Sequence, residues 1–157
     1  MDVNRHRLLG IYLNDHLTGA VVGVERARMT RDANQGTEFA GPLGVVCGEI
    51  EEDRGSLESI MDELGVGRSK VKPALGWLGE KAGRLKPNGQ LRGYSPLSRV
   101  IDLEVLLLGI TGKLRLWTLL AGLLDGESST DLAALIRRAE GQRATVEELQ
   151  SRAALRL

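Results

Sequence analysis

The chain has 157 residues, of which 42% are hydrophobic and only 3% aromatic, and its 21 basic side chains balance 21 acidic ones. This length suits one domain with a substantial core, and zero net charge gives no electrostatic reason to expect nucleic acid or a membrane surface as a partner. With so few aromatic residues the core must consist mainly of Leu, Val, Ile and Ala, which favours helices over sheets.

Cysteine content and hydropathy limit the class of protein further. Cys47 is the single cysteine, so an internal disulfide is excluded and a cysteine-based zinc site is not expected. The N-terminal "MDVNRHRLL" has no signal-peptide core, and the apolar stretch 100–124 contains Asp102, Glu104, Lys113 and Arg115. We therefore expect that stretch to be a buried helix, without an integral membrane segment, in a cytoplasmic protein.

Apolar residues at helical spacing predict four long helices and one short helix. The expected ranges are about 4–33, 37–65, 95–124 and 131–157 for the long helices and about 73–85 for the short one.

Local signals mark several of the helix ends. The sequence "NQG" (34–36) ends the first helix, with Gly36 in the left-handed conformation. Thr37 is a candidate N-cap for the second helix, although Pro42 requires that helix either to begin near Gly41 or to kink. Ser95 followed by proline fits the N-cap and first position of the third long helix.

The connections between the helices predict the topology. Short loops make the first two and the last two long helices antiparallel hairpins, and the connection 68–94 is long enough to cross from one end of the bundle to the other. We expect a single all-α domain, residues 1–157, with four helices, a crossover and a short extra helix. This helix order resembles the ferritin-like superfamily.

Three short stretches carry a second resemblance. They are "YLNDH" (12–16), "EIEEDR" (49–54) and "GWLGEK" (76–81). They are similar to stretches of uncharacterised bacterial helical proteins, and this resemblance implies no activity. The glycines near Gly23 and in "LGWLGEKAG" (75–83) lie within helical patterns, where we expect them to allow close packing.

Each long helix places one polar residue on its apolar face, which predicts a buried polar layer across the bundle. The helical rise per residue gives the height of each residue along the bundle axis, and in antiparallel helices His16 comes to the same height as Asp53. Arg115 and Gln142 come close to this level, and Glu104 lies roughly 10–16 Å away along the axis. The third long helix is then expected to bury Leu97, Val100, Ile101, Leu107, Leu108 and Thr111. A layer of this kind fixes the register of the helices by satisfying its own hydrogen bonds.

A ferritin-like di-iron site requires Glu-x-x-His on two helices. The chain has only His6 and His16, and neither follows a glutamate by three residues. We expect no metal, no cofactor and no catalysis, and instead a binding, scaffold or oligomer-forming role. The alternative left open is a metal-binding protein or metal-dependent oxidoreductase with the ligands His16, Asp53 and Glu104.

Two surfaces are candidates for partners. The crossover carries a basic set that could meet an acidic partner or simply remain solvated: Lys70, Lys72, Lys81, Arg84 and Lys86. The third long helix is apolar around most of its circumference. Its second apolar side contains Leu103, Leu106, Ile110, Leu114 and Trp117. One four-helix core does not cover both sides, so we expect a homodimer through this helix or the adjoining crossover.

Overall fold

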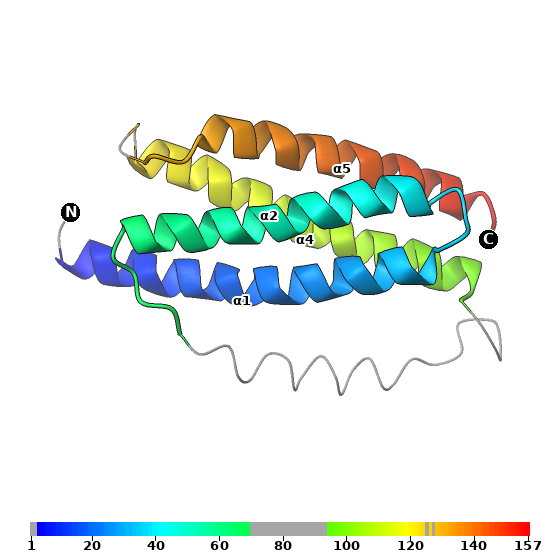
Figure 1. Ribbon diagram of the computed structural model, residues 1–157, viewed down its shortest axis with the longest axis horizontal. Coiled ribbons are helices and arrows are strands. Elements are labelled where there is room, and N and C mark those ends of the chain that lie inside the picture. Colours follow the sequence, from blue (N-terminus) through cyan, green and yellow to red (C-terminus); the bar gives the residue numbers. More distant parts are fainter. Residues whose placement is uncertain (1–2, 70–93, 125, 127) are drawn as a thin grey trace.

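The computed structural model describes residues 3–69, 94–124, 126 and 128–157, and in these residues the chain contains four helices and no strand (Figure 1). The helices are α1 (Val3–Ala33), α2 (Ala40–Glu63), α4 (Pro96–Leu124) and α5 (Leu132–Ala154). The expected all-α four-helix bundle is therefore confirmed. The predicted short helix near 73–85 lies outside the described residues.

The helices are arranged as two neighbouring pairs. In Figure 1, α1 and α2 lie side by side and run in opposite directions, and so do α4 and α5. The pairs meet where α1 packs against α4 and where α2 packs against α5. The end of α2 and the beginning of α4 lie at opposite ends of the bundle (Figure 1).

Helix ends follow the local signals in most places. Gly36 has φ of +75°, as expected after α1, and Asp131 caps α5 by accepting a 2.8 Å hydrogen bond from the Ala134 N–H. Ser95 caps α4 by accepting from the Ser98 N–H at 3.0 Å. Gly65, with φ of +65°, ends α2 in a Schellman turn whose Val66 N–H donates to the Met61 carbonyl at 2.8 Å.

The predicted N-cap of α2 is wrong. Phe39 occupies that position, while the Thr37 hydroxyl donates to the Asn34 carbonyl at 2.7 Å within the preceding turn. Starting the helix at Ala40 places Pro42 in the first turn, where its missing N–H leaves no helical hydrogen bond unmade. The helix therefore begins close to Gly41, and Pro42 is accommodated in the first turn.

The core consists of two apolar halves along the bundle axis. One half contains Trp117 and lies towards the N-terminal end of α1, and the other contains Phe39 and lies towards its C-terminal end. On α2, the halves are separated at Asp53, between Ile50 and Leu57. A polar group thus lies at the middle of a bundle that is otherwise apolar inside.

The predicted buried face is right for α5 and wrong for α4. On α5, the apolar side that carries Gln142 is buried, together with Leu135, Ala139 and Val146. On α4, the side expected to form a dimer is the core side, and the side expected to be buried is largely exposed: Leu97, Ile101, Leu108 and Thr111. Because α4 is apolar around most of its circumference, the hydrophobic pattern does not determine which side turns inward.

Within the described part of the chain, α4 is also the one helix long and apolar enough to cross a membrane. The core helix of a soluble protein meets the same criterion.

Candidate functional site

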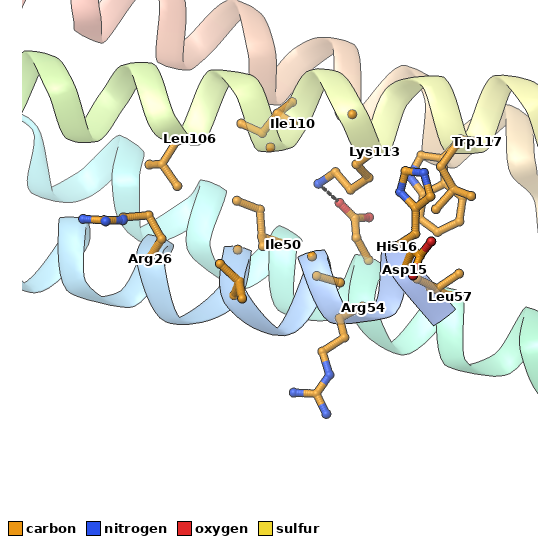
Figure 2. Close-up of a pocket in the computed structure, with 18 of the residues that line it drawn as sticks. Asp15, His16, Arg26, Ile50, Arg54, Leu57, Leu106, Ile110, Lys113 and Trp117 are labelled. Atoms are coloured by element: carbon orange, nitrogen blue, oxygen red, sulfur yellow. Dashed lines mark hydrogen bonds and ion pairs between the residues drawn. The ribbon is translucent and has the colours of Figure 1, made fainter. Parts of the chain in front are cut away.

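A hydrogen-bonded polar cluster occupies the middle of the bundle. Asp53, whose side chain is 1% exposed, accepts from the Lys113 ammonium through Oδ2 (Figure 2, dashed line). Lys113 Nζ also donates to Gln142 Oε1 at 2.5 Å, and Gln142 Nε2 donates to the same Asp53 oxygen at 3.0 Å. The three side chains come from α2, α4 and α5, so their hydrogen bonds connect three helices at the same height along the bundle axis.

A second cation meets the same carboxylate. One guanidinium nitrogen of Arg138 lies 2.6 Å from Asp53 Oδ1 as an ion pair without hydrogen-bond alignment, and the other donates to Glu52 at 2.7 Å. Burial lowers the pKa of Lys113, and the neighbouring Asp53 carboxylate opposes that shift. The Lys113 charge inside the bundle therefore depends on Asp53 to offset its desolvation.

The structure brings together only some of the predicted polar layer. Asp53 and Gln142 are buried and hydrogen-bonded to each other, but Glu104 and Arg115 are exposed on the outer side of α4 and belong to no such layer. Their assignment is corrected because α4 turns a different face inward. The cations that sequence reasoning missed are Lys113 and Arg138.

A cavity of about 590 Å³ lies beside this cluster, between α1, α2 and α4 (Figure 2). Four glycines line it, two on each of the facing helices: Gly19, Gly23, Gly109 and Gly112. A Cβ added at any of them would meet no atom within 4 Å. Gly23 was expected to allow close packing, and it lines an open space instead.

The remaining cavity wall is mainly apolar. It includes Ile50, Leu57, Leu106, Ile110 and Leu116, with Lys113 and Asp53 on the side of the polar cluster. Two further charged residues of the lining already have partners, because Arg26 pairs with Asp102 at 3.1 Å and Arg54 with Glu58 at 2.8 Å.

Four polar side chains of the lining have no hydrogen-bond partner among the described residues. Two of them, Trp117 and His16, are buried or partly buried nitrogen groups, and the other two are the Tyr12 hydroxyl and the exposed Asp15 carboxylate. Trp117 is 1% exposed, and its buried Nε1–H donates to nothing there. His16 is partly buried and contacts the Tyr12 ring edge-on, with centroids 4.5 Å apart, but its ring nitrogens form no hydrogen bond. His16 and Asp53 thus both line the cavity, but they do not form the contact that was expected from their similar height along the bundle axis.

The lowered pKa of His16 predicts how the stability of the protein depends on pH. Burial lowers its pKa below 6.5, against the opposing effect of Asp15. The unfolded chain therefore binds more protons than the folded one, and stability rises with pH through the window below 6.5. We expect His16→Gln to flatten this rise in urea unfolding between about pH 4.5 and 7. NMR titration of the His16 imidazole would contradict the prediction if its midpoint lay at or above 6.5.

The alternative metal site receives no geometric support. Among the described residues, no group of three or more His, Cys, Asp or Glu side chains lies close enough to hold an ion. His16 and Asp53 line the cavity, but Glu104 points outward, and Asp53 faces two cations that would repel a metal. The basic set Lys70, Lys72, Lys81, Arg84 and Lys86 lies outside the described residues.

Comparison of the chain with protein-family models, with curated proteins and with solved structures finds no match. Any functional conclusion must therefore come from the cavity and its lining.

Proposed function

We propose that this protein is a ferritin-like helical bundle, without a di-iron centre, that binds a small and largely apolar molecule in the cavity between α1, α2 and α4. The observation that carries the proposal is the cavity of about 590 Å³, which has an apolar wall and an unpartnered donor, Trp117 Nε1–H. Ligand pockets of proteins share this volume range and this composition. The proposed role is binding, in the cytoplasm, and not catalysis.

The ferritin-like assignment rests on helix order and direction. Two antiparallel pairs, with the end of α2 and the beginning of α4 at opposite ends of the bundle, are compatible with that topology (Figure 1). Proteins built this way place their cofactor and ligand sites in the bundle core, between facing helices. The cavity here has the same location, but its lining lacks a set of carboxylates and histidines that could hold iron.

The lining specifies the chemistry of the ligand. Lys113 and Asp53 satisfy each other, and Asp15, the one charged residue of the lining without an ion pair among the described residues, is exposed, so the cavity offers no free buried charge. Trp117 offers a hydrogen-bond donor, and a neutral His16 offers both a donor and an acceptor. The best ligand is therefore a neutral, mostly hydrocarbon molecule with one acceptor, such as an ether or a ketone.

The glycines of the lining carry an energetic cost. Glycine inside a helix destabilises it by about 0.5–1 kcal/mol relative to alanine. The chain nevertheless places Gly19 and Gly23 on one wall and Gly109 and Gly112 on the other, where alanine would fit without a clash. Glycine at these four positions leaves room for a bound molecule, which supports the proposal.

The test uses the neutral fluorescent probe N-phenyl-1-naphthylamine with a Trp77→Phe variant, so that Trp117 is the only tryptophan. We expect saturable binding of one probe per chain, with energy transfer from Trp117 to the probe. Gly23→Leu, which directs a side chain into the cavity, should weaken binding at least tenfold.

Gly55→Leu is the matched control, because Gly55 is an exposed helical glycine away from the cavity. It should bind the probe like the parent. Absence of saturable binding, or equal binding by the Gly23 and Gly55 variants, would contradict the proposed function.

A further inference from the structure

The outward side of α4 carries a continuous apolar stripe. Its members are 38–70% exposed and recur every three or four residues, apart from the gap between 108 and 119: Leu97, Ile101, Val105, Leu108, Leu119 and Leu123. This outer face of α4, as we call it, lies opposite the side that carries the buried Leu103, Ile110 and Trp117. Gly112 and Arg115 occupy the stripe positions in the gap.

The spacing of the stripe is symmetric about residue 110. Leu97 and Leu123 are each 13 residues from that point, and Ile101 and Leu119 are each 9 residues from it. Leu108 and Gly112 are each two residues from it. If two α4 helices lay antiparallel with their residues 110 at the same level, leucine or isoleucine would meet leucine at both ends. At the centre, Leu108 of one protomer would lie opposite Gly112 of its partner, where the absence of a side chain leaves room for the leucine.

The charges on the outer face of α4 have nearly the same centre, between residues 109 and 110. Glu104 and Arg115 are exposed, and neither forms an ion pair with any other described residue. They lie six residues before and five residues after residue 110. In the antiparallel arrangement, Glu104 of one protomer comes level with Arg115 of its partner, and the pair occurs twice. A parallel arrangement would instead place like charges together.

We propose that two copies of this chain associate through the outer face of α4, antiparallel and about a two-fold axis at the level of Ile110. An isologous interface requires a surface that is complementary to itself, and here both the apolar residues and the charges meet that requirement. This dimer uses a different side of α4 from the one expected from sequence, because Leu106 and Leu114 are buried within the protomer. Val105 and Gly112 of this face also line the cavity, so the proposed interface adjoins the proposed binding site.

The first experiment measures association by sedimentation equilibrium between about 1 and 100 µM. We expect the wild-type chain to be dimeric at tens of micromolar. Leu108→Lys should raise the dimer dissociation constant at least a hundredfold, because it places charges near the axis. Val45→Lys is the control, since Val45 is 63% exposed on α2 and outside this face. It should leave association unchanged.

The second experiment exchanges the charges. Glu104→Arg and Arg115→Glu should each weaken the dimer about tenfold, and the double variant should recover to within about threefold of wild type. Both positions are exposed, so folding should be retained, which circular dichroism would verify. A merely structural role for either residue would not produce this recovery.

Several results would overturn the proposal. A wild-type monomer at 100 µM would do so, as would a dimer insensitive to Leu108→Lys or a double variant that stays weak. If the chain is monomeric and Leu108→Lys lowers its unfolding midpoint, another part of the same chain covers the face. If the chain instead sediments with phosphatidylcholine vesicles until Leu108→Lys is introduced, the face binds a membrane.

Discussion

Asp53→Ala is expected to lower the free energy of unfolding by about 3–5 kcal/mol, because it leaves a buried cation without its counterion. The Lys113 side chain is only 15% exposed and would keep just the Gln142 oxygen as an acceptor. Arg138, whose side chain is 25% exposed, retains its ion pair with Glu52 and contributes less to the loss. Urea unfolding at neutral pH, followed by circular dichroism, measures the change.

A double-mutant cycle tests whether the loss comes from the stranded lysine. Adding Lys113→Met to Asp53→Ala removes the unpaired charge, so the double variant should be more stable than the sum of the single effects predicts, by at least about 1 kcal/mol. Glu58→Ala is the control, because Glu58 forms an i,i+4 pair with Arg54 near the surface, and its removal should cost under about 1 kcal/mol. Additive effects at Asp53 and Lys113 would show that the cluster is not an energetic unit.

Features set by local chemistry could be predicted from the sequence. Gly36 ends α1 through its backbone freedom, and Ser95 begins α4 through its side-chain oxygen. The buried side of α5 was also predictable, because its apolar and polar residues separate cleanly at helical spacing. Gln142 on that side was therefore correctly placed inside the bundle.

The side of α4 that turns inward could not be predicted in the same way. Leucine and isoleucine surround this helix, so a rotation of half a turn exchanges one apolar side for another. That rotation decides whether Arg115 or Lys113 meets Asp53. A useful signal was available: a lysine on the core side satisfies a buried aspartate, whereas Glu104 on that side would add a second buried carboxylate.

The cavity could not be predicted, because it depends on the distance between α1 and α4. Gly19 and Gly23 are four residues apart on one helix, and Gly109 and Gly112 are three apart on the other. Such spacing is compatible both with close helix contact and with an open space. The structure contains the open space, and His16 lines it without a hydrogen-bond partner among the described residues.

Replacing Gly19, Gly23 and Gly109 together by alanine is expected to stabilise the protein by about 1.5–3 kcal/mol and to weaken probe binding. Each position lies inside a helix, and an added Cβ meets no atom within 4 Å, so the helical preference of alanine is gained without strain. All three glycines line the cavity, so the added methyl groups are expected to reduce the space for the probe. Thermal and urea unfolding measure the gain, and fluorescence titration measures binding.

The matched control replaces three exposed helical glycines outside the cavity, Gly48, Gly55 and Gly141. An added Cβ is equally unobstructed there, so the control should gain similar stability but bind the probe like the parent. A stability gain in both triple variants with loss of binding only in the first would show that the cavity glycines are retained for the ligand at the expense of stability. Equal binding by the two variants would mean that these glycines do not shape the binding site.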